Sequence, residues 1–141
     1  MLRTIGYQDA TQAEVIDRLR AAGVGLLVDV RAVAASRRAG FSKTVLRESL
    51  AEAGIDYRHL RALGTPKAGR DAARKGRTEE MRAVFADQLA TPEAQDQLAE
   101  LAALARARPT AILCFCAEPA GCHRRVLAER LAGGGIAWED L

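Results

Sequence analysis

The sequence predicts a single α/β domain built on a mostly parallel sheet of about five strands. Short apolar runs alternate with longer amphipathic segments along the chain, which is the pattern of consecutive βαβ units. Two of these runs, Leu26–Val30 and Ala111–Phe115, are almost continuously apolar, as expected for strands buried on both faces. The length of 141 residues suits one domain. These features predict a three-layer, Rossmann-like fold with helices on both faces of the sheet.

The alternation of apolar runs and amphipathic segments predicts where each strand and each helix lies in the sequence. The apolar runs predict five strands, at Leu2–Ile5, Leu26–Val30, Ile55–Leu60, Ala111–Phe115 and Ile136–Trp138. The amphipathic segments predict five helices, at residues 12–22, 43–53, 78–89, 92–107 and 122–131. Capping signals support several of the helix starts. Thr11 precedes Glu14 at the capping-box spacing, Thr91 precedes a proline suited to a first helical position, and Ser42 is expected to cap the second helix.

Residues 61–77 are the exception, and we expect a long loop there. The segment is rich in Gly, Lys and Arg. From residue 67 onward a single Asp71 offsets five cations: Lys67, Arg70, Arg74, Lys75 and Arg77. Loops of this length are uncommon in compact domains unless they act as lids or binding loops. The sequence leaves two alternatives open, a solvated loop and a lid that closes over an anion.

Composition narrows the class of partner. Aromatic residues make up 4% of the chain, so no platform for stacking bases stands out. The net charge of +3 weakly favours an anionic ligand. No apolar run approaches the roughly 20 residues needed to span a bilayer, so no membrane partner is expected. Three cysteines in a chain without an export signal predict free thiols and a cytoplasmic location.

A first group of polar residues follows the strand at 26–30. The carboxyl ends of parallel strands share one sheet edge, where α/β proteins bind their ligands. Asp29 stands in an otherwise apolar run, so its carboxylate needs a partner. It either pairs with Arg31, Arg37 or Arg124 as a structural contact, or acts as an acid/base group. Arginines at this edge suit bidentate recognition of phosphate or carboxylate.

A second group lies between Cys114 and Arg124, where a strand runs through a turn into a helix. Cys122 falls near the helix start, where unpaired N–H groups and the helix dipole stabilise a thiolate. His123 is placed to act as a base or thiolate partner. The sequence leaves four interpretations open: buried structural thiols, a reactive thiolate, a zinc site and a redox pair of Cys116 with Cys122. The zinc interpretation is disfavoured because no Cys-x2-Cys knuckle is present.

Several short segments together resemble domain-of-unknown-function family 488 over nearly the whole chain. They are Thr4-Ile5-Gly6, Val28-Asp29-Val30-Arg31, Ser36-Arg37, Phe41-Ser42-Lys43, Gly54-Ile55-Asp56-Tyr57-Arg58-His59-Leu60, Leu63-Gly64, Cys116-Ala117-Glu118-Pro119 and Cys122-His123-Arg124. The resemblance implies a compact α/β fold and no assigned activity. Two departures stand out: Tyr7 replaces a histidine usual after Thr-Ile-Gly, and Ala34 replaces a common proline.

The leading functional hypothesis is a thiol-dependent hydrolase or transferase that acts on a phosphorylated or otherwise anionic small molecule. The expected catalytic residues are Cys122, Cys116, His123 and Asp29. The expected substrate-binding residues are Arg31, Arg37, Arg124, Glu118, Tyr7 and Lys67. No metal or cofactor is expected. The alternatives are a non-catalytic module that binds nucleotide or nucleic acid through the arginines, and a thiol redox sensor.

Overall fold

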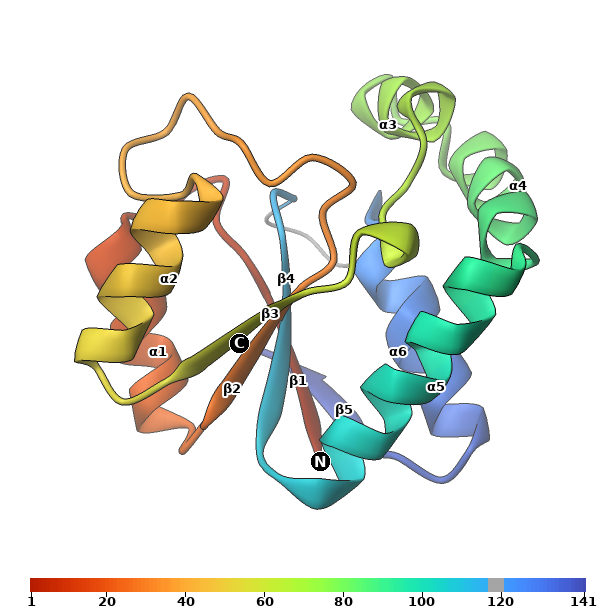
Figure 1. Ribbon diagram of the computed structural model, residues 1–141. Helices are drawn as coiled ribbons and strands as arrows, with labels where there is room; N and C mark the ends of the chain where they lie inside the picture. Colours follow the sequence, from red (N-terminus) through yellow and green to blue (C-terminus); the bar gives the residue numbers. More distant parts are fainter. Residues whose placement is uncertain (117–120) are drawn as a thin grey trace.

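The computed structural model describes residues 1–116 and 121–141 of the chain. It contains one sheet of five parallel strands in the order β3-β2-β4-β1-β5 (Figure 1). The strands are β1 (Leu2–Gly6), β2 (Leu26–Asp29), β3 (Asp56–His59), β4 (Thr110–Cys114) and β5 (Trp138–Asp140). The predicted single α/β fold with a parallel five-stranded sheet is confirmed.

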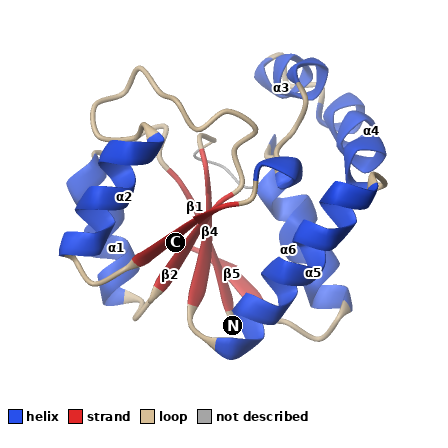
Figure 2. Cartoon of the chain, viewed as in Figure 1, coloured by secondary structure: helices blue, strands red, loops and turns tan. Residues whose placement is uncertain are grey.

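Helices cover both faces of this sheet (Figure 2). They are α1 (Gln12–Ala21), α2 (Lys43–Glu52), α3 (Lys67–Arg74), α4 (Thr78–Leu89), α5 (Pro92–Ala107) and α6 (His123–Gly133), with a short 3₁₀ turn, η1, at Arg61–Leu63. In both views α1 and α2 lie on one side of the strands and α4, α5 and α6 on the other. The result is the three-layer arrangement that the alternation of strands and helices predicts.

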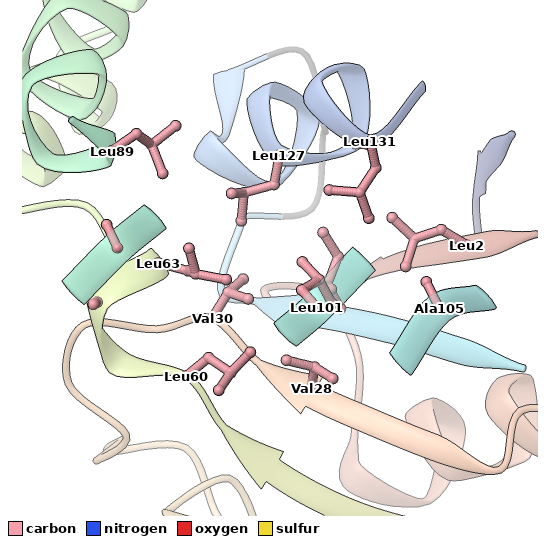
Figure 3. Close-up of a cluster of buried hydrophobic side chains, with 14 of the residues drawn as sticks. Leu2, Val28, Val30, Leu60, Leu63, Leu89, Leu101, Ala105, Leu127 and Leu131 are labelled. Carbon is pink, nitrogen blue, oxygen red and sulfur yellow. The ribbon is translucent and has the colours of Figure 1, made fainter. Parts of the chain in front are cut away.

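Two apolar cores follow from the alternation of side chains along the buried strands. Leu27 of β2 packs in the core under α1 and α2, while its neighbour Val28 packs in the core under α4, α5 and α6. Ile112 of β4 also faces the second core, shown in Figure 3. Because successive residues point to opposite faces, a strand covered on both sides must be apolar throughout. All residues of β2 and β4 are buried.

Helix starts agree in most places with their capping signals. Thr11 and Glu14 form the expected reciprocal capping box at α1, and Thr91 caps α5 by accepting from the backbone N–H of Ala94. Ser42 precedes α2 as expected, but its hydroxyl makes no capping bond. It donates to the carbonyl of Ser36 and accepts from the N–H of the same residue, so it orders the preceding loop instead.

The predicted long loop at residues 61–77 is wrong in its conformation. The segment contains η1 and the eight-residue helix α3. Gly69, which suggested a loop, lies where α3 meets its neighbours: an added Cβ would clash with the Cγ2 of Thr65 and come within 3.3 Å of Cγ1 of Val84 in α4. The glycine therefore permits close packing of helices and does not break the chain.

The topology places a crevice at the carboxyl end of β4. The helices that follow β1 and β2 lie on one face, whereas α6, which follows β4, lies on the other. When the connections after two neighbouring strands run to opposite faces of the sheet, a space remains between these connections. α/β proteins bind ligands in such spaces. The register holds the strand ends level there, with Gly6 opposite Cys114 and Asp29 opposite both Leu113 and His59.

None of the helices in the described part of the chain has both the length and the apolar character to cross a membrane.

Candidate functional site

A cavity of about 580 Å³ lies at the carboxyl edge of the sheet. Its wall comes from the segments that follow β1, β2 and β4, together with α3 and the start of α6. Four arginines line it: Arg31, Arg37, Arg70 and Arg74. No aspartate or glutamate lines it among the residues that the structure describes. The cavity is therefore surrounded by positive charge, as a site for an anion requires.

Asp29 and Arg31 form the best-defined polar contact beside this cavity. Asp29 is fully buried, and Arg31 is 6% exposed. Nε of Arg31 donates to Oδ1 of Asp29 at 2.9 Å, and Nη2 donates to Oδ2 at 2.7 Å. The backbone N–H of Arg31 also donates to Oδ1. Of the two alternatives for Asp29, a structural pair or an acid/base group, the structure shows the pair with Arg31.

The remaining contacts of this pair fix its position. Nη1 of Arg31 donates to the hydroxyl of Tyr7 at 3.1 Å and to the carbonyl of Phe41 at 2.8 Å. The hydroxyl of Tyr57 donates to Oδ2 of Asp29 at 2.5 Å. Burial alone would lower the pKa of Arg31, but the hydrogen bonds and charge of Asp29 outweigh it and raise that pKa. Arg31 is thus a permanent, rigidly held cation in the cavity wall.

Tyr7 follows β1 and lines the cavity. Its ring stacks on Phe41 with centroids 4.2 Å apart, and Phe115 meets it edge-on at 5.4 Å. The side chain is buried, while its hydroxyl reaches Arg31. Tyr7 therefore acts as part of the wall, joining the apolar core under α1 and α2 to the charged pair.

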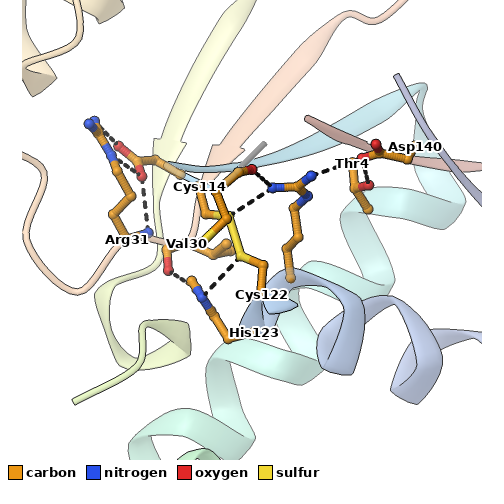
Figure 4. The surroundings of a disulfide bond; sticks show 10 residues. Thr4, Val30, Arg31, Cys114, Cys122, His123 and Asp140 are labelled. Carbon is orange, nitrogen blue, oxygen red and sulfur yellow. Dashed lines mark hydrogen bonds and ion pairs between the residues drawn. A yellow bond between two sulfur atoms is a disulfide. The ribbon is translucent and has the colours of Figure 1, made fainter. Parts of the chain in front are cut away.

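The three cysteines line the cavity where β4 ends and α6 begins, and Figure 4 shows Cys114 and Cys122 there. The structure joins Cys114 to Cys122 by a disulfide and leaves Cys116 as a free thiol. The predicted redox pair of Cys116 with Cys122 is therefore wrong, because Cys122 is paired with Cys114 and not with Cys116. The expectation of three free thiols is wrong for Cys114 and Cys122. Burial raises the pKa of the Cys116 thiol, and the charge of Arg124 offsets this effect only in part.

His123 begins α6 and lines the cavity beside Cys122. Its Nε2 lies 2.8 Å from the carbonyl of Val30, and its Nδ1 lies 3.7 Å from the sulfur of Cys122. A carbonyl only accepts, so Nε2 carries the hydrogen in the neutral ring and Nδ1 is the acceptor. Burial lowers the pKa of His123 to about 4, so the imidazole is neutral near pH 7. A neutral ring with its free nitrogen toward a thiol is suited to accept a proton or a metal ion.

Arg124 is not among the residues that line the cavity, although it contacts one of the sulfur atoms. Its side chain is fully buried. Nη1 donates to the sulfur of Cys114 at 3.2 Å and to the carbonyl of Cys116, and Nη2 contacts Oδ1 of Asp140 at 3.2 Å. Arg124 therefore holds the turn after β4 against β5, and it does not line the cavity.

The structure brings together six of the ten residues that sequence reasoning selected for the site. Those that line the cavity are Cys122, Cys116, His123, Arg31, Arg37 and Tyr7. Asp29, Arg124 and Lys67 are not part of the described wall. Glu118 lies outside the described residues. The parallel topology accounts for this convergence, since each of the six follows the carboxyl end of a strand.

The lining residues that were not selected as site residues from the sequence include Thr65, Arg70 and Arg74. Thr65 is 3% exposed, and its hydroxyl has no hydrogen-bond partner among the described residues. Arg70 donates to the carbonyl of Thr65 at 2.8 Å, so α3 and the turn before it form one side of the cavity. The sequence placed Arg70 and Arg74 in a charged loop that could form a lid over an anion, because a short basic helix carrying a glycine resembles such a loop.

Comparison with known proteins supplies a family. Residues 11–131 match the model of the family described as Domain of unknown function DUF488. The chain belongs to this family. No curated protein and no solved structure was found to be similar. The DUF488 match confirms the resemblance carried by the short sequence segments, and it adds no activity, so the argument for function rests on the geometry of the cavity.

Proposed function

We propose that this DUF488 protein binds a small molecule that carries a phosphate or a similar anionic group in the cavity at the carboxyl edge of the sheet. The observation that carries the proposal is the lining itself: four arginines and, among the described residues, no carboxylate. Arg31 and Arg74 already pair with Asp29 and Asp71, whereas Arg37 and Arg70 have no ion pair among the described residues, so a bound anion would supply the counter-charge that these two lack. Guanidinium groups also match the oxygen spacing of phosphate.

The four arginines divide into two kinds, and Arg31 and Arg74 form the first because each already pairs with an aspartate, Asp29 and Asp71 respectively. Arg31 uses four hydrogen bonds on Asp29, Tyr7 and Phe41, so it supplies fixed charge. Arg37 is exposed, and within the described part of the chain its guanidinium has no hydrogen bond or ion pair. Arg70 has one donor on the carbonyl of Thr65, which leaves further N–H groups available. Arg37 and Arg70 are therefore the proposed direct contacts to the anion.

The hydroxyl of Thr65 is a second, independent observation that supports the same site. A buried hydroxyl without a partner costs roughly 1–3 kcal/mol, so proteins usually satisfy it. Thr65 lines the cavity, and its Oγ1 has no hydrogen-bond partner among the described residues. A ligand oxygen would provide the missing partner. The proposed site thus combines two cations that have N–H groups available with a neutral donor held in the wall.

The dimensions of the cavity favour a small molecule over nucleic acid. Its volume of about 580 Å³ falls within the roughly 300–1,000 Å³ of small-ligand pockets. Nucleic acid is more often bound by an extended basic surface, with aromatic side chains where single strands stack. The chain has 4% aromatic residues. We therefore place the nucleic-acid module second, and its signature would be a steep fall in affinity with salt for a long polyanion.

Thiol catalysis is the enzymatic extension of this proposal. Cys122 is the N-cap residue of α6 and lines the cavity. In the reduced chain its thiol would lie beside a helix N-terminus, which favours the thiolate. The paired state with Cys114 blocks that chemistry. A thiol-dependent transferase or hydrolase would therefore lose activity on oxidation and regain it with a reductant.

The test is anion binding by the reduced protein, measured by isothermal titration calorimetry with phosphate, sulfate, a nucleoside monophosphate and acetate. Charge-assisted hydrogen bonds contribute about 1.5–3 kcal/mol, so Arg37→Ala and Arg70→Ala should each weaken phosphate or phosphomonoester binding by about 10- to 100-fold. Arg20→Ala is the matched control, because Arg20 is an exposed arginine near the end of α1 and outside the cavity wall. Equal affinity in all three variants, or no binding by any anion of the panel, would overturn the proposal.

A further inference from the structure

The sulfur atoms of all three cysteines lie within 4.8 Å of one another. Cys114 and Cys122 are almost fully buried, and Cys116 is partly buried. A tetrahedral zinc ion with Zn–S bonds of about 2.3 Å places its sulfur ligands about 3.8 Å apart. The three sulfur atoms therefore lie close enough together for one shared metal ion once the disulfide of Cys114 and Cys122 is reduced and these two sulfurs separate. They come from the end of β4 and the start of α6.

The backbone at Cys114 and Cys122 fits a shared ion better than a direct bond. Their Cα atoms are 7.9 Å apart. Disulfide-bonded cysteines usually have Cα atoms about 4.4–6.8 Å apart, and wider pairs need backbone movement to close. A metal ion between two sulfurs lengthens the bridge, so it accommodates the wider spacing. The disulfide also leaves the third thiol of the cluster, Cys116, without a role, whereas a metal ion uses all three.

Arg124 provides the charge that such a site needs. Three thiolates and one divalent cation carry a net charge of −1, which is costly to bury alone. The guanidinium of Arg124 is fully buried and donates to the sulfur of Cys114 at 3.2 Å. It also donates to the carbonyl of Cys116. Outer hydrogen bonds of this kind orient metal ligands and tune their charge.

His123 is oriented as metal-binding histidines are. Such residues usually donate their second ring N–H to a carbonyl or carboxylate, which turns the other nitrogen toward the metal. Nε2 of His123 bonds to the carbonyl of Val30 at 2.8 Å, and Nδ1 faces the sulfur of Cys122 at 3.7 Å (Figure 4). A tetrahedral ion bound to Cys122 would have its nitrogen ligand at a similar distance from that sulfur.

We propose that the reduced chain binds one zinc-type divalent cation through the thiolates of Cys114, Cys116 and Cys122, with Nδ1 of His123 as the fourth ligand. Binding replaces three S–H bonds by three metal–sulfur bonds and releases three protons, with no change in oxidation state. The disulfide form of Cys114 and Cys122 cannot bind in this way, so a two-electron oxidation by a disulfide or peroxide would release the ion. The proposed ligands line the same cavity as the anion site, but they include none of its arginines, so variants of the arginines and of the cysteines test the two proposals separately.

The experiment is a Co²⁺ titration of the full chain, freed of metal and kept reduced with a phosphine. We expect one equivalent to bind, with intense sulfur-to-cobalt charge-transfer absorption in the near ultraviolet and strong visible bands of a tetrahedral ion. Zn²⁺ should displace the cobalt. The variant Cys116→Ser keeps Cys114 and Cys122 but removes a ligand, so Co²⁺ affinity should fall by more than the roughly 10- to 100-fold that outer-shell changes produce. His123→Gln should shift the visible bands by replacing nitrogen with oxygen.

The possible results of the Co²⁺ titration distinguish a metal site from a cysteine cluster that binds no metal. Absence of stoichiometric Co²⁺ binding by the reduced chain would overturn the metal site, as would unchanged affinity and charge-transfer absorption in Cys116→Ser. Circular dichroism of each variant checks that it is folded, and a conservative Cys116→Ala variant repeats the test if the serine disturbs the turn. Arg37→Ala and Arg70→Ala should retain full Co²⁺ binding, so a failure of the anion proposal leaves this result interpretable.

Discussion

Asp29 accepts hydrogen bonds from the side chain of Arg31 at both carboxylate oxygens, although a single residue separates the two in the chain. Arg31 follows the end of β2, where the backbone leaves the sheet, so its side chain can turn back toward the preceding carboxylate. The pair is buried, and it joins the loop after β2 to β1 through Tyr7 and to β3 through Tyr57. It therefore holds the wall of the cavity in place.

Removing one member of this pair should be strongly destabilising. Asp29→Asn leaves Arg31 buried without its counter-ion, and the loss of one partner from a buried pair costs about 3–5 kcal/mol. The free energy of unfolding, measured by urea denaturation, should fall by that amount. Arg31→Met in the Asp29→Asn background should cost less than the sum of the two single changes, since neither charge is then left alone.

An exposed pair in the same chain provides the control. Arg58 donates two hydrogen bonds to Glu100 in a bidentate arrangement like that of Arg31 and Asp29. Both side chains are well exposed to solvent, so the pair should contribute at most about 1 kcal/mol. If Glu100→Gln destabilises the protein as much as Asp29→Asn does, burial does not determine how much an ion pair contributes to stability, and the interpretation of Asp29 fails.

Tyr57 should make stability fall at alkaline pH. Burial and the negative charge of Asp29 raise the pKa of Tyr57 above its usual value near 10. The folded state therefore favours the neutral phenol, which donates to Asp29. This contribution is fully present below about pH 10 and decreases as the pH rises beyond the pKa of the unfolded chain. Urea midpoints between pH 8 and pH 11 should fall more steeply for the natural protein than for Tyr57→Phe. Parallel curves would contradict the prediction.

The fold could be predicted because its signals are local and strong. Apart from Asp29, Leu26–Val30 is apolar, and so is the run that contains Ile112, as expected for strands that are covered on both faces. Helix α3 could not be predicted in the same way. Its glycine was interpreted as a loop residue, whereas Gly69 has no Cβ because Thr65 and Val84 approach it closely. The sequence does not distinguish a glycine needed for packing from one needed for a turn.

The location of the candidate site could be predicted from the sequence, but its side-chain contacts could be predicted only in part. Parallel strands bring their carboxyl ends to one edge, so Tyr7, Arg31 and Cys116 converge by topology. The direction of each side chain depends on neighbours that the sequence does not show. Arg124 turns into the sulfur cluster instead of the cavity. The spacing of the cysteines argued against zinc, yet the return of α6 onto the sheet brings Cys122 to the end of β4.

Gly6 should tolerate no side chain. It ends β1 opposite Cys114, and an added Cβ would clash with the carbonyl of Cys116 and lie 2.5 Å from Nη1 of Arg124. Gly6→Ala should therefore destabilise the protein by at least the roughly 1–3 kcal/mol of an overpacked core. Gly133→Ala is the matched control, because a Cβ there meets no atom within 4 Å. Alanine near the end of α6 should be neutral or stabilising by about 0.5–1 kcal/mol. Similar thermal denaturation midpoints for the two variants would refute the steric argument.

Thr65 should show opposite effects on stability and on binding. Its hydroxyl is buried beside the cavity without a hydrogen-bond partner among the described residues. Thr65→Val keeps the shape of the side chain and removes the unsatisfied group, so the free energy of unfolding should stay equal or rise by about 1 kcal/mol. Affinity for the anion should fall by about tenfold if the hydroxyl donates to it, since one hydrogen bond contributes about 1 kcal/mol. Calorimetry and urea denaturation on the same samples measure both quantities. A variant that is less stable and binds normally would show that Thr65 serves the fold and not the ligand.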